Sequence, residues 1–199
     1  MNKTAWPIKY EKLFTSTGNY YEFAHIAWGG FEIQTAGYCL GYKKSADTLI
    51  NDAISSKDIE KLDTFVFPAI FLYRQYIELT LKSLILTFSE LDSDAKINKF
   101  KTYNHNLHNL WVDFKSIYSK TTNIPNDTAV NIVEKYITDL HELDKTSFSF
   151  RYPFTKELEL IFPKEKRINL KHLKDRMNEI ESFFNGTSDY MYEINRTQK

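Results

Sequence analysis

The sequence has only one cysteine, Cys39, so no internal disulfide and no cysteine-based zinc site can form within it. Its apolar neighbours Ala36, Tyr38 and Leu40 predict a buried, unreactive thiol rather than a nucleophile. Glycine and proline are also scarce, with 6 and 5 residues among 199. Few tight turns are therefore available, whereas a fold of many strands needs them. These shortages favour a mostly helical protein.

Neither sign of charge is in excess, because lysine plus arginine and aspartate plus glutamate each number 26. The chain as a whole thus lacks the basic field that attracts nucleic acid or an anionic membrane. It also lacks an uncharged apolar run of roughly 18–20 residues, which a membrane span requires. Residues 1–10 lack the apolar segment of a signal peptide. We expect a cytoplasmic protein that does not bind membranes.

Apolar residues, in contrast, are plentiful. Hydrophobic residues make up 42% of the chain and aromatic residues 16%, which is enough to bury the core of a single domain spanning 1–199. Within it we expect three parts: an aromatic N-terminal arm at 1–30, a helical bundle at 31–184 and a polar tail at 185–199. Ordered aromatic arms of this kind wrap a bundle or a partner.

Apolar residues recur at helical spacing in five stretches. They predict helices at about 31–54, 57–91, 104–118, 127–143 and 169–184. Pro68 should kink the second of these helices or divide it. We interpret 92–103 as a polar connector and Asn185-Gly186 as the end of the last helix.

The pattern changes between about 146 and 168. Alternating polar and aromatic residues begin this segment, and Pro153 and Pro163 exclude a long helix. The predicted fold is therefore all-α, a bundle of four to five helices with a small irregular or β-hairpin insert near 146–168.

The most apolar predicted helix carries three charged residues, Arg74, Glu78 and Lys82. Their spacing of i, i+4 and i+8 places them on one stripe of the helix. One interpretation is a salt-bridge ladder on a partly exposed face, with a few tenths of a kcal/mol for each pair. The other is a buried or site-lining cluster, in which Glu78 holds Arg74 for recognition of a phosphate or carboxylate.

Two histidines, His105 and His108, lie three residues apart at the start of a predicted helix. A metal site would need a third ligand, and no compact cluster supplies one, so we expect no metal and no other cofactor. His105 is then either a hydrogen-bond partner of a neighbouring helix or a proton donor or acceptor near pH 7.

Arg151 lies between aromatic residues, and Tyr152 precedes Pro153, which favours an extended, rigid backbone. Such a loop would fix the position of the guanidinium. Arg151 could pair with Asp144 or Glu78 and pin the insert to the bundle, or it could bind a ligand. We expect Arg151 or His105 to lie within reach of the charged stripe.

Arg167 and His172 form the last candidate pair, with four residues between them at the start of the final predicted helix. The spacing alone is a weak signal, because a pair of this kind also arises by chance in a chain of this composition.

Three blocks of the sequence, taken in order, resemble a group of uncharacterised bacterial proteins related to the HEPN superfamily. The blocks are Arg74 to Lys82, His105 to Trp111 and Phe150 to Pro153, and the resemblance covers roughly 31–184. It implies a bundle of four or five helices that is often dimeric. HEPN proteins include metal-independent ribonucleases of toxin–antitoxin and phage-defence systems, and also non-catalytic members that bind nucleotides or partners.

The resemblance also implies a role for the last candidate pair. In the nucleases, an arginine and a histidine separated by four to six residues act on the RNA 2′-OH and the scissile phosphate across a dimer interface. Arg167 and His172 match that spacing. Ile168 stands where the nucleases often have a polar residue, which is a departure from their pattern.

The expected function is a HEPN-like helical binding module of a bacterial toxin–antitoxin or phage-defence system, which binds a nucleotide, nucleic acid or a partner protein. The alternative is a metal-independent ribonuclease toxin with Arg167 and His172 as catalytic residues. In both cases we expect self-association as a homodimer. The candidate ligand-binding or buried polar cluster consists of Arg74, Glu78, Lys82, His105, Arg151 and Tyr152.

Overall fold

The computed structural model describes residues 6–197, and within this range the regular secondary structure is helical, with no β-strand. The all-α prediction is confirmed, although six α-helices occur in the described range instead of four or five. The elements are η1, a 3-10 turn (Tyr20–Glu22), α1 (Phe31–Ser56), α2 (Ile59–Phe88), α3 (Ser93–Tyr103), α4 (Leu107–Thr122), α5 (Thr128–Leu143) and α6 (Leu170–Thr197).

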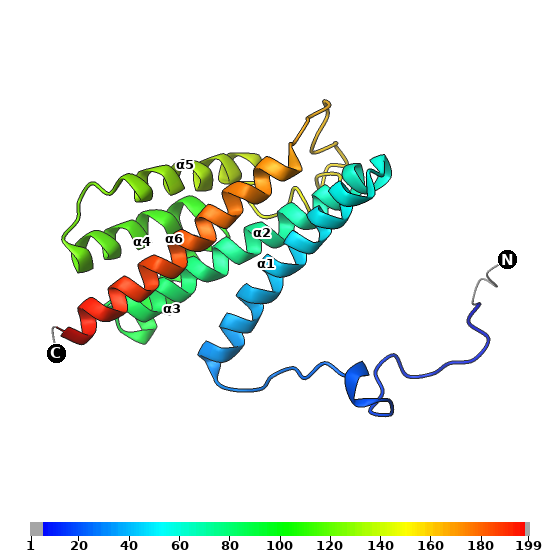
Figure 1. Ribbon diagram of the computed structural model, residues 1–199, viewed down its shortest axis with the longest axis horizontal. Coiled ribbons are helices and arrows are strands. Elements are labelled where there is room, and N and C mark those ends of the chain that lie inside the picture. The colour runs from blue at the N-terminus through cyan, green and yellow to red at the C-terminus, as the bar shows by residue number, and fades with distance from the viewer. Residues whose placement is uncertain (1–5, 198–199) are drawn as a thin grey trace.

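The long helices pack as a bundle in which α1 and α2 form one antiparallel pair and α4 and α5 form another (Figure 1). Helix α6 contacts all four of these helices. Trp111 and Phe114 of α4 pack against Phe183 and Phe184 of α6. Ring centroids across this contact are 6.1 to 6.4 Å apart, and those of Phe183 and Phe184 are 5.8 Å apart. Burial of these aromatic side chains supplies much of the apolar stabilisation of the core.

Side-chain caps define where the helices begin. Asp58 starts α2 by accepting from the backbone N–H of Glu60 at 2.9 Å. Asn106 and Asp127 start α4 and α5 in the same way. Each cap satisfies N–H groups that have no partner within the helix. The start of α5 is where the sequence predicts it, whereas α4 begins at Leu107, about three residues after the predicted start of that helix at residue 104.

Pro68 lies inside α2, and the helix continues through it. A division of this helix, one of the two predicted outcomes, does not occur. Proline removes one helical hydrogen bond, but Pro68 is exposed, so the carbonyl that loses its partner can bond to water. Packing of α2 against its neighbours then outweighs the local cost.

Two predicted boundaries are wrong because polar sequences form helix here. Residues 93–103, predicted as part of a connector, form α3, with Asp92 as its cap. None of its residues is buried, and only Phe100 and Tyr103 pack against the core. The predicted tail likewise belongs to α6, which continues past Gly186 because Thr187 and Met191 are buried against the bundle.

The segment between α5 and α6 is irregular. Its one β feature is an isolated antiparallel bridge between Phe154 and Leu160. Thr155 Oγ1 accepts from the backbone N–H groups of Glu157 and Glu159, and Pro153 and Pro163 interrupt any regular pairing. Separately, none of the helices described in residues 6–197 combines the length and the apolar character needed to cross a membrane.

Gly186 provides a direct test of the length of α6. Its position is helical without a left-handed backbone, and an added Cβ would meet no atom within 4 Å. Gly186→Ala should therefore increase the free energy of unfolding by about 0.5–1 kcal/mol, because alanine loses less backbone entropy on folding. Urea denaturation followed by circular dichroism measures this change. A decrease in stability would instead place a helix end at Gly186.

Candidate functional site

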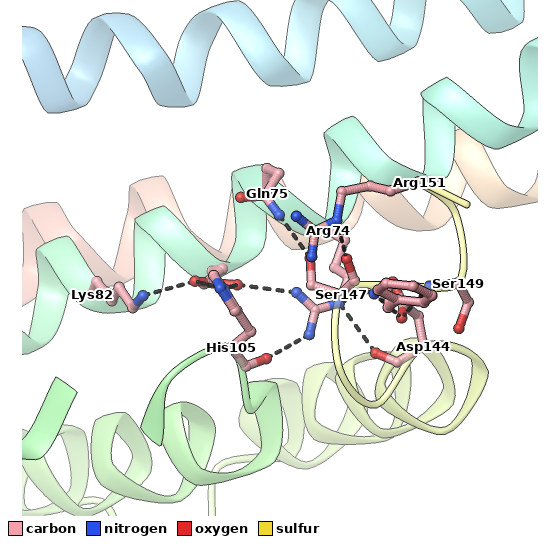
Figure 2. A network of polar contacts seen from close by, with 10 residues as sticks. Arg74, Gln75, Lys82, His105, Asp144, Ser147, Ser149 and Arg151 are labelled. Carbon is pink, nitrogen blue, oxygen red and sulfur yellow. Dashed lines mark hydrogen bonds and ion pairs between the residues drawn. The ribbon is translucent and has the colours of Figure 1, made fainter. Parts of the chain in front are cut away.

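A buried arginine in the middle of α2 organises the candidate site (Figure 2). Arg74 has no exposed surface. Its guanidinium donates to Glu78 (Nη1 to Oε2, 3.0 Å), to the carbonyl of His105 and to the carbonyl of Asp144 (Nε to O, 3.2 Å). The Asp144 carboxylate lies 3.5 Å from the same Nε. One side chain thus ties α2 to the residues just before α4 and just after α5.

Burial determines the electrostatics of Arg74. Burial lowers the pKa of the guanidinium, and the negative charges of Asp144 and Glu78 oppose that shift. An isolated buried charge would be very costly, so the two carboxylates are what make this position possible.

Glu78 is almost as buried, with 2% exposure. Its Oε1 accepts from Lys82 Nζ at 2.7 Å and lies 3.0 Å from His105 Nδ1. Burial raises the pKa of Glu78, but hydrogen bonds and charges from Lys82 and His105 outweigh it and leave the pKa lowered. The structure therefore brings Arg74, Glu78, Lys82 and His105 together. Lys82 and His105 lie at the margin, with side chains 23% and 40% exposed.

The Asp144 side of this network fixes the start of the insert. Asp144 is 1% exposed, and its Oδ1 accepts from the backbone N–H groups of Phe148 (2.9 Å) and Ser149 (3.1 Å). Ser147 adopts a left-handed backbone (φ 63°), and its hydroxyl accepts from Gln75 Nε2 of α2 at 3.0 Å. The turn at 147–149 is therefore held both by the Asp144 carboxylate and by α2.

Arg151 does not make the predicted ion pair with Asp144 or Glu78. Its Nε donates to the carbonyl of Ser147, and its guanidinium lies 5.9 and 6.0 Å from the ring centroids of Tyr152 and Phe71. Arg151 and Tyr152 are exposed. Arg74, not Arg151, pins the insert, because Asp144 already faces the buried guanidinium of α2.

A cleft of about 880 Å³ lies where the insert meets the end of α1, the start of α2 and the start of α6. Its apolar floor includes Phe67, Phe150 and Phe162, and the ring centroids of Phe150 and Phe162 are 5.4 Å apart. Its rim carries cationic residues from the segment before α6 and the first turn of that helix, namely Lys164, Lys166, Arg167 and Lys171.

Arg167 and His172 are not part of the buried network. The Arg167 side chain is 92% exposed and pairs with Glu165 at 2.9 Å. His172 is exposed on the first turn of α6, where its backbone N–H donates to Asn169. Within the described part of the chain, neither side chain makes a hydrogen bond to the Arg74 network.

Sequence reasoning missed a second buried cation, Lys43 of α1. It is 1% exposed, and its ammonium contacts Asp47 (2.7 Å), Asn178 (2.8 Å) and Glu181 (3.1 Å). The hydroxyl of Tyr73 donates to Asp47 at 2.6 Å, and burial together with this carboxylate raises the pKa of Tyr73. The i, i+4 spacing of Lys43 and Asp47 was the available signal. This network joins α1, α2 and α6.

A pair of histidines joins α4 to α5. The rings of His108 and His141 stack with centroids 6.2 Å apart. His141 Nδ1 is buried and lacks a hydrogen-bond partner among the described residues. Burial lowers the pKa of His141, and the nearby His108 and Arg74 act in the same direction, whereas Glu142 opposes them.

The Arg74 network is charge-balanced within itself, since Arg74 and Lys82 face Glu78 and Asp144. Its hydrogen bonds and ion pairs fix the relative positions of the segments that it joins. No group of three His, Cys, Asp or Glu side chains in residues 6–197 converges to hold a metal ion. Comparison of the chain with protein-family models, curated proteins and solved structures finds no significant match.

Removal of the Glu78 charge should strongly destabilise the fold. Glu78→Gln leaves Asp144, 3.5 Å away, as the remaining carboxylate beside the buried guanidinium, and we expect a loss of about 3 kcal/mol in the free energy of unfolding. Glu134→Gln is the matched control, because Glu134 pairs with Lys115 across α4 and α5 with a side chain that is 33% exposed. That change should cost less than about 1 kcal/mol. Equal losses in urea denaturation would contradict a special role for Glu78.

Stability should fall in mild acid because of His141. The folded-state pKa of His141 is lowered, whereas in the unfolded chain it is about 6.5. Its contribution is therefore complete above about pH 6.5 and is lost as the pH falls through the folded-state value. His141→Gln should reduce the difference in unfolding free energy between pH 7.5 and pH 5.5, and His172→Gln, at an exposed site, should not. The same difference in both variants would argue against this assignment.

Proposed function

We propose that this chain is a HEPN-like helical binding module of a bacterial toxin–antitoxin or phage-defence system, and that it binds a nucleotide or a short single-stranded nucleic acid. The observation that carries the proposal is the cleft of about 880 Å³, with an aromatic floor below a cationic rim. Its volume falls within the roughly 300–1,000 Å³ that ligand pockets occupy.

The floor of the cleft is suited to a flat, apolar group such as a nucleobase. Phe67 is 45% exposed, and its ring centroid lies 6.4 Å from that of Phe150. Stacking of a base on an aromatic ring is tolerant of sequence, and each base contributes roughly 1–3 kcal/mol.

The rim is suited to phosphate. Arg167 and Lys171 pair with acidic residues, but Lys164 and Lys166 make no ion pair with any residue of the described range. The first turn of α6 also borders the cleft, and a helix N-terminus attracts anions. Asp63 and Glu165 also line the cleft, but the basic residues of the rim outnumber them, so the net charge of the lining is positive.

The buried network supports this function indirectly. Arg74 holds Asp144, and Asp144 holds the turn at 147–149. The next residue, Phe150, is part of the floor. The cleft is thus anchored to the centre of α2, which favours a preformed binding site over one that must be ordered by its ligand.

The alternative function is a metal-independent ribonuclease. Arg167 lies on the rim of the cleft and His172 on the first turn of α6, and both are exposed to an incoming RNA. In this mechanism the RNA 2′-OH attacks the adjacent phosphate, so that a 2′,3′-cyclic phosphate forms, the bond from phosphorus to the 5′-oxygen breaks, and that oxygen leaves as a hydroxyl. Histidine transfers a proton in this step, and arginine stabilises the negative charge on the phosphate.

Binding should depend on the floor and the rim together. In titrations of adenosine triphosphate by calorimetry and of a labelled single-stranded RNA by fluorescence anisotropy, Phe67→Ala should weaken binding at least five-fold, as expected for loss of one stacking contact. Lys164→Gln combined with Lys166→Gln should weaken it further and reduce its salt dependence. Lys101→Gln combined with Lys135→Gln, at exposed positions outside the cleft, is the matched control. Binding that all variants retain would reject the cleft as the site.

Ribonuclease activity, if present, should survive EDTA and disappear in His172→Ala. The assay uses structured and single-stranded RNA near neutral pH, and it compares the natural sequence with the variant. Cleavage that EDTA abolishes, or that persists without the imidazole, would exclude this mechanism. Binding without cleavage would favour the binding module.

A further inference from the structure

The segment 6–28 exposes ten large apolar side chains and does not pack on its own bundle. They are Trp6, Ile8, Tyr10, Leu13, Phe14, Tyr20, Tyr21, Phe23, Ile26 and Trp28, and all but Phe23 are more than 60% exposed. We call this segment the arm. Monomeric proteins rarely leave so much contiguous apolar surface in water.

The arm has local order that does not depend on the bundle. Asn19 begins η1 as a capping box: its side-chain oxygen accepts from the Tyr21 N–H, and its own N–H donates to the Glu22 carboxylate at 2.8 Å. The rings of Tyr20 and Tyr21 meet edge to face, with centroids 5.4 Å apart. The turn η1 therefore presents Tyr20 and Tyr21 in a defined arrangement.

The point where the arm leaves α1 is also fixed. Gly29 has a φ of 73°, and a Cβ at this position would lie 2.9 Å from Ile33 Cγ2. Gln34 reaches back with its side chain to the Gly29 carbonyl at 3.0 Å, and its N–H bonds to Gly30. The arm departs at the N-terminal end of α1 and runs apart from the helices (Figure 1). This exit directs the arm away from its own chain.

A groove with a mixed apolar and polar lining lies on the bundle beside that exit. It has a volume of about 340 Å³ and is bordered by α1, α2 and α6, with Ala36, Cys39, Tyr76, Leu84 and Phe184 among its lining residues. Exposed apolar residues of α1 flank the groove on two faces of the helix, with Phe31 and Tyr38 on one face and Ile33 and Leu40 on the other, where Leu40 also lines the groove.

We propose that two copies of this chain exchange arms, so that the arm of each packs on the α1–α6 groove of the other. Because each copy offers one arm and one groove, a single two-fold axis satisfies both, and the assembly closes as a dimer. The groove lies at the opposite end of α1 from Ile54, which borders the nucleotide cleft. The arm contacts therefore leave that cleft open.

The area of the arm supports a second copy as the occupant. An aromatic side chain buries roughly 150–250 Å², and six aromatic residues of the arm are more than 60% exposed. These alone offer roughly 500–1,000 Å², against about 800 Å² on each partner of a stable protein interface. The arm and the groove each carry both acidic and basic residues. Neither surface therefore favours a strongly charged partner.

Subunit mixing tests the exchange. At tens of micromolar, multi-angle light scattering should find a dimer for the natural sequence. It should find monomers for an arm variant (Phe14→Ser with Tyr21→Ser) and for a groove variant (Tyr38→Asp with Leu40→Asp). A mixture of the two variants should regain dimer, because one arm and one groove remain intact. Val112→Ser with Ile132→Ser, at exposed apolar positions on α4 and α5, is the matched control and should stay dimeric.

The native thiol in the groove distinguishes exchange from folding back. With Thr17→Cys, at an exposed polar position of the arm, a short bismaleimide should join the arm to Cys39 of a second chain and give a covalent dimer, which Cys39→Ser abolishes. Cys39 is only partly buried, and the reaction is run at alkaline pH because burial raises the pKa of its thiol. All substituted arm residues are exposed, so unchanged circular dichroism confirms that the variants fold. A monomeric natural protein, dimers that survive the arm substitutions, or a link formed within one chain would each overturn the proposal.

Discussion

A guanidinium with no access to water must be surrounded by partners, and this requirement shapes the centre of the molecule. Arg74 is such a group, and its partners come from the next turn of α2, from the residue that leads into α4 and from the residue that ends α5. Removal of any one partner would leave a buried charge incompletely neutralised. The positions of three segments distant in sequence are therefore coupled through one side chain, and the floor of the cleft follows from that coupling.

Lys43 imposes a similar constraint on the contact between α1 and α6. Its ammonium needs Asp47 on its own helix and Glu181 on α6, so these two helices can meet in only one register if the charge is to be satisfied. Apolar packing tolerates small shifts between helices, whereas a buried ion pair does not. Together the two buried cations specify how α1, α2, α5 and α6 are arranged around the apolar core.

Much of this arrangement could be predicted from the sequence, and the exceptions have physical causes. The stripe of Arg74, Glu78 and Lys82 was evident because i, i+4 spacing on an apolar helix is a local property. Asp144 as the partner of Arg74 was not, since the pairing joins residues 70 positions apart. The helix at 93–103 was missed because it buries no residue, and the continuation of α6 past Gly186 was missed because contacts at Thr187 and Met191 override a local stop signal.

The unbroken length of α6 has a consequence for communication within the protein. Its first turn borders the cleft, and residues three to five turns later, from Glu181 to Ser188, border the groove beside α1. A straight helix is stiff over such a distance, so a displacement of one end is transmitted to the other rather than absorbed between them. If a ligand in the cleft and the occupant of the groove each prefer one position of α6, each must change the affinity of the protein for the other by the same factor.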